Sequence, residues 1–261
     1  MLNPFPTPEF AWSLRMRSDS PEAFFAKRDS SGALLKEKNH WLDTQREHCL
    51  IETDNSDAFA TELWMLAKQW GQLEIRKDET LESLSRAWEA DLIFLNAETF
   101  TVAGGCVCFP SSWSLEEATG KTLETVHGVV PELNQTLSDK IHQFLKKLPS
   151  GKAFHRANWG MTRSDELNYH PALEHRKLDE TVTWEDLFLR IEHQAFLRVD
   201  PGIVLAVRIE PVALETLRNN HPEVLLHLRA QLATMPLAVA EYKNLDAAIP
   251  RVLELIDSAT T

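Results

Sequence analysis

The ten histidines have the widest chemical range of the side chains in this sequence, because imidazole can bind a metal and exchange a proton near neutral pH. None of them forms the i, i+4 pair that places two zinc ligands on one helix face, although His170 and His175 come close. His127 differs from the others, since it ends an amphipathic run that contains Leu123 and Val126. The pattern predicts that its ring projects from a helix end into an apolar interior.

An imidazole in such a place could be an axial ligand of a haem iron, which needs only one or two protein ligands. Zinc needs several converging protein ligands, so a zinc site is easier to recognise from the spacing of residues in a sequence. His127 is the predicted metal ligand, and His155 and His193 are the alternatives. His155 is next to Arg156 on a predicted strand, so strand alternation should turn these two side chains to opposite faces.

The charge of the sequence reverses locally between residues 140 and 163. Six basic side chains occur there without an acidic one: Lys140, Lys146, Lys147, Lys152, Arg156 and Arg163. The stretch predicts an anion site, for cofactor carboxylates or for an acidic protein surface, because guanidinium groups bind carboxylates in a bidentate way. The alternative is the solvated face of a helix over 131–148. Arg156 has the apolar neighbours Phe154, Ala157 and Trp159 on a predicted strand, which favours a half-buried place for its guanidinium.

A second polar pattern follows the predicted strand 184–198. Even-numbered positions of this strand carry four polar side chains, which should share one face, while the other face is apolar. These four residues are Arg190, Glu192, Gln194 and Arg198. Such a face is either the solvent side of an antiparallel sheet or a hydrogen-bonded network that supports a site.

Composition argues against several classes of protein. The net charge of −12, from 27 basic and 39 acidic residues, argues against a nucleic-acid binder. Three cysteines are too few for a four-thiolate iron–sulfur cluster, and the sequence lacks glycine-rich nucleotide-binding motifs. We therefore expect no flavin, NAD or iron–sulfur site in this chain. The sequence has neither a long apolar run nor a signal-peptide pattern, so we expect a cytoplasmic protein without membrane contact.

Strand and helix patterns predict an α+β fold in one domain over residues 1–261. Five short apolar segments bounded by turn residues are predicted strands: 91–96, 100–109, 153–162, 184–198 and 202–210. They lack βαβ alternation, which favours a largely antiparallel sheet wrapped by N- and C-terminal helices.

The predicted helices are amphipathic and cover 32–50, 56–70, 80–88, 114–127, 131–148 and 211–258. Pro222, Pro236 and Pro250 should break the last of these helical stretches. Gly104-Gly105 predicts a bulge or a close approach of two backbones, and the polar segment 163–183 predicts a long loop.

Several of these residues occur in a distinctive order. Cys108-Phe109-Pro110-Ser111-Ser112-Trp113 is followed by Val126-His127-x-x-Val130-Pro131, Arg156-Ala157-Asn158-Trp159, Arg190-x-Glu192-x-Gln194-x-x-x-Arg198 and Arg208. This order, together with the closing Tyr242-Lys243, resembles the haem-dependent oxidative N-demethylase family over nearly the whole chain.

The resemblance implies a PAS-like antiparallel sheet of about five strands that binds b-type haem. The residues that it implies for the cofactor are His127, Arg156, Asn158, Trp159, Arg190, Glu192, Arg198 and Arg208, with His127 on the iron. In that family the haem subunit oxidises a small secondary amine such as dimethylamine with O2, giving methylamine and formaldehyde. Electrons reach it from NADPH through flavin and iron–sulfur groups on partner subunits.

Three classes of function follow from these observations. The first is a haem enzyme whose partners are a small amine, O2 and a reductase subunit. The second is a PAS-like module that binds haem or a small ligand for sensing or electron transfer. The third is a family member that lacks the cofactor and acts as a structural or interaction protein. A haem absorption band would exclude the third class, and amine-dependent O2 consumption would separate the first from the second.

Overall fold

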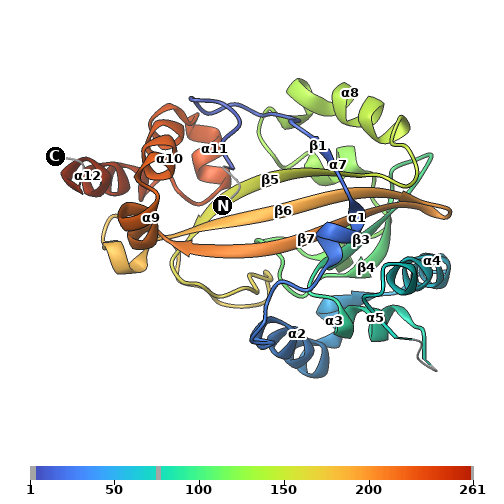
Figure 1. The fold of residues 1–261 in the computed structure, drawn as a ribbon. Helices are drawn as coiled ribbons and strands as arrows, with labels where there is room; N and C mark the ends of the chain where they lie inside the picture. Colours follow the sequence, from blue (N-terminus) through green and yellow to red (C-terminus); the bar gives the residue numbers. More distant parts are fainter. Residues whose placement is uncertain (1–3, 75–77, 260–261) are drawn as a thin grey trace.

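One antiparallel sheet organises the chain in the computed structural model, which describes residues 4–74 and 78–259. Within these residues the sheet has seven strands in the order β1-β5-β6-β7-β3-β4-β2 (Figure 1). The strands are β1 (Arg17–Asp19), β2 (Leu50–Ile51), β3 (Asp91–Asn96), β4 (Val102–Cys106), β5 (Ala153–Thr162), β6 (Phe188–Val199) and β7 (Gly202–Ala213). The α+β class and the antiparallel pairing are confirmed.

All five predicted strands are present. The segments 91–96 and 153–162 coincide with β3 and β5, and the other three strands have different ends. The segment predicted over 184–198 begins with a short 3-10 helix, η1 (Trp184–Asp186), before β6 starts at Phe188. The prediction of about five strands missed β1 and β2, which pair at the two edges of the sheet. These strands have three and two residues, too few for a period-2 pattern to be recognised.

The twelve helices of the described residues occur in three groups along the chain. The first group precedes β3 and contains α1 (Pro21–Phe25), α2 (Ala33–Thr44), α3 (Arg46–Cys49), α4 (Ser56–Gln69) and α5 (Leu81–Ala87). The second lies between β4 and β5 and contains α6 (Leu115–Ala118), α7 (Leu123–His127) and α8 (Leu133–Lys146). The third follows β7 and contains α9 (Leu214–Asn220), α10 (Pro222–Thr234), α11 (Leu237–Tyr242) and α12 (Ile249–Ala259).

The C-terminal prolines mark the beginnings of helices. Pro222 is in the first turn of α10, Pro236 is the N-cap residue of α11, and Pro250 is the second residue of α12. A proline is tolerated in a first helical turn because its missing N–H would have no partner inside the helix there. These positions therefore divide the predicted helical stretch into separate helices.

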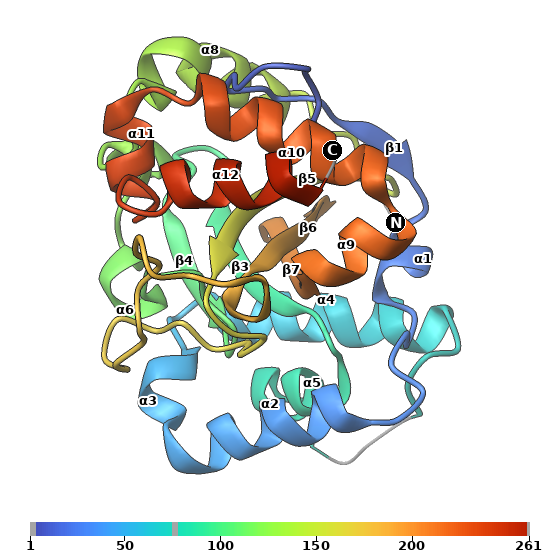
Figure 2. The same cartoon turned by 90° about the vertical axis from the view of Figure 1, so that its left-hand side faces the viewer.

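The two faces of the sheet have different coverings (Figures 1 and 2). On the face that we call the α4 face, Leu92, Phe94 and Ala206 pack with the N-terminal helices, and Phe59 of α4 stacks on Phe94. The C-terminal helices pack near the start of β6, around residues such as Ile191. On the opposite face, the α8 face, Ile93, Leu95, Phe196 and Ile203 pack with α6, α7 and α8. Both views place α8 and α11 on the side of the sheet away from α2 and α5.

Gly104 and Gly105 occupy the close approach that their sequence predicts. Their φ angles are 89° and 140°, in the region that favours glycine. A Cβ atom at Gly104 would overlap the carbonyl oxygen of Ile51, and one at Gly105 would overlap that of Leu92. The pairing of β3 with β4 also shifts register between Ile93 and Leu95, as expected for a bulge.

The segment 163–183 contains no helix or strand and is the long loop that the sequence predicts. A backbone bridge between Ser111 and Tyr169 ties it to the segment that follows β4. No helix in the described part of the chain is long and apolar enough to cross a membrane.

Candidate cofactor site

Four polar side chains form a patch on the α8 face. The pairing of β5 with β6 sets Arg156 opposite Gln194 and Asn158 opposite Glu192, and all four are half-buried. The amide nitrogens of Asn158 and Gln194 both donate to Oε2 of Glu192, over 3.2 and 3.1 Å. We call these four residues the polar patch. Its hydrogen bonds fix the position of the Glu192 carboxylate, so the network that the period-2 pattern allowed is present.

Apolar side chains continue the same face beside the polar patch. Leu205 and Val207 lie on β7, the central strand of the sheet, and yet both remain partly exposed. Val207 is the register partner of Gln194, and Leu205 is that of the buried Phe196. The sheet face is therefore incompletely covered where its polar and apolar halves meet.

His127 is the last residue of α7 and lies against α8, among Asn134, Ser138 and Ile141. Burial and the positive charge of Arg156 lower the pKa of His127 to about 4. The ring is therefore neutral at physiological pH, as a metal-binding imidazole must be. Neither ring nitrogen has a hydrogen bond within the part of the chain that the structure describes. The helix end predicted for His127 is confirmed, and the structure brings it near Arg156.

Arg156 is half-buried, and its surroundings differ from those of the buried arginines Arg190 and Arg208. Burial lowers the pKa of its guanidinium, and the Glu192 carboxylate opposes this shift. Among the described residues no carboxylate lies within 4 Å of it, and no hydrogen bond from it is found. A buried cation without a close counterion is costly unless a ligand supplies the negative charge. Arg156 is thus suited to an anionic group that enters from outside the chain.

Lys243 follows α11 and closes the edge of the sheet beside the polar patch. Its Nζ donates to the carbonyl oxygen of Trp159 over 2.8 Å and lies 5.2 Å from the centre of that ring. Burial lowers the pKa of Lys243 to about 8, with Glu192 opposing and Arg156 adding to the shift. Burial and Glu192 also raise the pKa of Tyr242. The sequence indicates Tyr242-Lys243 only through a family resemblance, because the position of this pair after a long helical tail gives no spatial signal.

Trp159 contributes to this region through its backbone. Its ring is 6% exposed and packs edge-on against Phe5, with 5.2 Å between the ring centres. The strand alternation that turns Arg156 and Asn158 to the α8 face turns this ring to the α4 face. The structure therefore separates the Trp159 side chain from the polar patch.

Arg190 and Arg198 direct their guanidinium groups at loop and helix ends. Arg190 donates to the Ser111 hydroxyl and to four carbonyl oxygens, those of Phe109, Pro110, Glu166 and Leu167. Arg198 donates to the carbonyl oxygens of Leu145 and Leu148, over 2.8 and 2.7 Å, and so caps the C-terminal end of α8. Arg190 thus joins the segment after β4 to the loop 163–183. Both side chains position elements around the polar patch.

Arg208 lies on the α4 face, away from the polar patch. It pairs with Glu89 and donates to the carbonyl oxygen of Ala26. The two alternative ligands, His155 and His193, lie on the same face, where His155 contacts the Phe24 ring. Nε2 of His193 is 2.7 Å from a carboxylate oxygen of Glu210. Of the three candidate imidazoles, the structure places only that of His127 beside Arg156.

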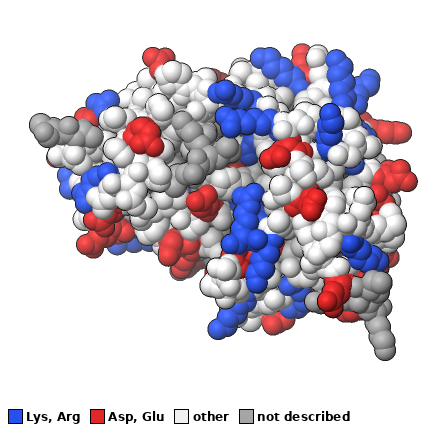
Figure 3. Space-filling model, viewed as in Figure 1, with Lys and Arg blue, Asp and Glu red and all other residues white. Residues whose placement is uncertain are grey.

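The basic stretch divides into three groups. Four lysines on α8 and just after it are exposed, as the solvated-face alternative expects: Lys140, Lys146, Lys147 and Lys152. Figure 3 shows basic side chains on the surface over α8. Arg163 pairs with Asp179 over 3.1 Å and with Asp186 over 3.3 Å. Arg156 alone among the six reaches the polar patch.

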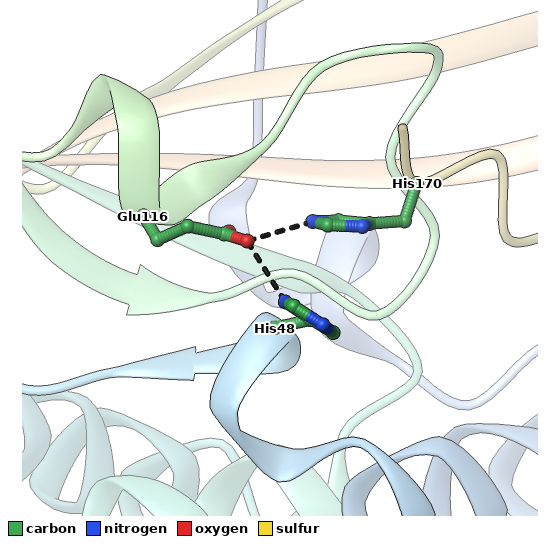
Figure 4. Close-up of side chains that lie close together, drawn as sticks. All are labelled: His48, Glu116 and His170. Atoms are coloured by element: carbon green, nitrogen blue, oxygen red, sulfur yellow. Dashed lines mark hydrogen bonds and ion pairs between the residues drawn. The ribbon is translucent and has the colours of Figure 1, made fainter. Parts of the chain in front are cut away.

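A further cluster, which sequence reasoning missed, contains His48, Glu116 and His170 (Figure 4). Oε1 of Glu116 is 2.9 Å from Nδ1 of His48 and 3.0 Å from Nε2 of His170. Two imidazoles and one carboxylate are a ligand set used by zinc and by non-haem iron. The three residues come from α3, α6 and the loop 163–183, so no local spacing could reveal them.

The second ring nitrogen of His170 decides which role this cluster has. The backbone N–H of Ala172 donates to Nδ1 of His170 over 3.1 Å. A neutral imidazole carries one proton, which must then lie on Nε2 and point at Glu116. Metal-bound histidines instead donate from their second nitrogen. In this geometry the cluster is a hydrogen-bonded network, and a metal would require the His170 ring to turn.

Comparison with protein families gives one result. A family model described as haem-dependent oxidative N-demethylase, alpha subunit-like, matches residues 36–253 of the 261. The matched range contains His127, the polar patch and Lys243. No curated protein matches the chain.

Proposed function

Because the chain belongs to the haem-dependent oxidative N-demethylase, alpha subunit-like family, we propose that it binds b-type haem on the α8 face, at His127 and the polar patch. The observation that carries this proposal is that the neutral imidazole of His127 lies near the guanidinium of Arg156, which has no carboxylate within 4 Å among the described residues. A haem presents an iron that accepts a neutral imidazole and propionates that accept a guanidinium. The partly exposed Leu205 and Val207 supply apolar surface beside them.

The residues present fit the group in three separate respects. His127 would ligate the iron, since burial keeps it unprotonated. Arg156 would hold a propionate, because it has no carboxylate within 4 Å among the described residues. The Arg190 and Arg198 side chains would keep the surrounding loop and α8 in place through their carbonyl contacts.

We propose further that the protein is the oxygen-activating subunit of an oxidative N-demethylase, with dimethylamine-like amines as substrates. When bound, the haem would supply the chemistry of O2 activation, which amino-acid side chains lack. A small secondary amine is protonated at neutral pH and needs an anion to bind it. Glu192 offers that anion, because two amide groups hold its carboxylate in place. Electrons would come from flavin and iron–sulfur groups on a partner subunit.

Two narrower expectations belong to the same proposal. The antiparallel sheet and its flanking helices agree with a PAS-like arrangement, which the family resemblance implies. The three described cysteines are all free and buried, which agrees with a reducing, cytoplasmic location.

The first experiment is an absorption spectrum of protein produced with a haem supply, in both oxidation states. We expect a Soret band whose position changes in His127→Ala and whose intensity falls in Arg156→Ala. Asn134→Ala is a matched control, because that side chain is also near His127 but offers no charge. A His127→Ala spectrum identical to the parent at full occupancy would reject His127 as the ligand.

The second experiment measures amine-dependent O2 consumption with a flavin and iron–sulfur reductase supplied. We expect turnover with dimethylamine, and a rise of at least tenfold in KM for Glu192→Gln at little change in haem content. Haem binding without any amine-dependent turnover would support the alternative of a haem-binding module.

A further inference from the structure

An open cavity of about 230 Å³ lies between the loop 163–178, Ser112 and the turn at Lys243–Asn244. This volume is below the roughly 300–1,000 Å³ of sites for drug-sized molecules, so the cavity suits a smaller ligand. The basic side chains that line it are Arg163, His170, His175, Arg176, Lys177 and Lys243. No aspartate or glutamate of the described chain lines it, in a protein with a net charge of −12.

The basic groups of this cavity are unequally neutralised. Arg163 is compensated, since it pairs with Asp179 and Asp186. The Arg176 side chain is 67% exposed, and its closest carboxylate oxygen, on Asp179, is 3.9 Å away, so this charge is weakly compensated. The Lys177 ammonium has no ion pair or hydrogen bond to any described residue. Lys243 uses one of its three protons on the Trp159 carbonyl, so donors remain for a ligand.

The backbone around the cavity is held in an uncommon conformation. Ser112 and Asn244 have φ angles of 62° and 54°, and both line the cavity. Only two other non-glycine residues of the described chain, Phe100 and Glu132, have positive φ. Such residues persist where their surroundings fix them, as the bond from the Ser112 N–H to the Tyr169 carbonyl does here. Ser112 and Asn244 therefore border the same space from segments that are far apart in the sequence.

We propose that this cavity binds a small anion that carries carboxylate or phosphate groups. Arg176, Lys177 and Lys243 supply the positive charge, and Ser112, Thr162 and Asn244 supply neutral hydrogen-bonding groups. The site goes beyond the proposed function, because none of these contacts requires haem. A protonated amine would be repelled here, so the amine and the anion have separate sites. Lys243 couples the two, since its charge also acts on Arg156 and Glu192.

The anion can come from two sources, a free small molecule or the propionates of a haem that extends into the cavity. The test is isothermal titration of the full chain, without and with haem, using citrate and inorganic phosphate as probes at constant ionic strength. The variant Arg176→Ala/Lys177→Ala removes two charges from the cavity. Lys146→Ala/Lys147→Ala removes the same charge from the exposed end of α8 and is the matched control.

We expect the cavity variant to weaken binding of citrate or phosphate at least tenfold, and the control to leave it unchanged. Binding that persists in the haem-loaded protein identifies a free anion. Binding that haem blocks, with weaker haem retention in the cavity variant, identifies the propionates. The proposal is overturned if neither probe binds and haem retention is unchanged, or if both variants weaken binding equally. The Soret band reports the proposed haem function separately from these results.

Discussion

The two faces of the sheet differ in whether their poorly solvated cations have a carboxylate partner. On the side of the N-terminal helices, Arg208 pairs with Glu89, and Nζ of Lys38 is 3.1 Å from Asp91. All four of these side chains are at least nine-tenths buried. On the α8 face, Arg156 has no carboxylate within 4 Å in the described part of the chain. A buried pair with both partners present serves the fold, whereas at Arg156 the proposed ligand would bring the missing charge.

This contrast makes the predicted effect of a substitution depend on the face. Removing a charge from the α4 face leaves its partner buried and alone, so the whole fold should be destabilised. Removing a charge from the polar patch should instead change ligand binding while the fold persists.

Glu89→Ala should destabilise the protein by about 3–5 kcal/mol, the usual cost of an uncompensated buried charge. The carboxylate also accepts the backbone N–H groups of Arg28 and Asp29, which would lose their acceptor. Urea unfolding followed by circular dichroism measures the change. Glu52→Ala is the control, because Glu52 forms only an exposed pair with Arg46 and should cost less than about 1 kcal/mol. Equal losses for the two variants would contradict the contrast.

Acid should destabilise the parent protein through His127. The pKa of His127 is about 4 in the folded chain, whereas an ordinary histidine, as in the unfolded chain, has a pKa of 6.5. The unfolded chain therefore binds the proton more readily. Stability should therefore fall as pH decreases from about 6.5 to 4, by up to about 3 kcal/mol from this group at 1.36 kcal/mol per pKa unit. Unfolding curves at several pH values, compared with those of His127→Phe, isolate the effect. An identical pH dependence in the variant would mean that His127 is accessible to protons in the folded state.

Arg156→Ala should change the free energy of unfolding by less than about 1 kcal/mol, because no paired carboxylate is left behind. The same variant should retain haem at least tenfold more weakly. Urea unfolding of haem-free protein and haem transfer to an acceptor protein measure the two quantities. A loss of several kcal/mol in the haem-free protein would show that Arg156 is a structural residue like Arg208.

Chelation should have the smallest effect. Because the proton on Nε2 of His170 points at Glu116, we expect EDTA to leave the melting temperature of haem-free protein unchanged. A structural metal contributes directly to folding, so its removal would lower the melting temperature by several degrees. Such a fall, absent in His48→Ala, would establish a metal at His48, Glu116 and His170.

Local sequence patterns account for much of the fold and for part of the site. Period-2 alternation located five strands, correctly turned Arg156 and His155 to opposite faces, and set Glu192 and Gln194 on one face. It could not reveal the roles of Arg190 and Arg198, whose acceptors are backbone carbonyls of distant loops and helix ends. Lys243 and the cluster of His48, Glu116 and His170 were missed for the same reason. The residues that they contact depend on how loops cross the sheet, and local sequence patterns do not predict the course of these loops.

The pairing order of the sheet also constrains how the chain can be made. β3 pairs with β7, which is synthesised more than a hundred residues later, and β1 pairs with β5. The apolar side chains Leu92 and Phe94 therefore have no strand partner on that side until the ribosome has passed Ala213. Pairings so distant in sequence fold slowly and expose apolar surface in the meantime. Nascent chains that stop before Phe188 should accordingly aggregate or bind chaperones, and complete chains should recover only after β6 and β7 form their hairpin.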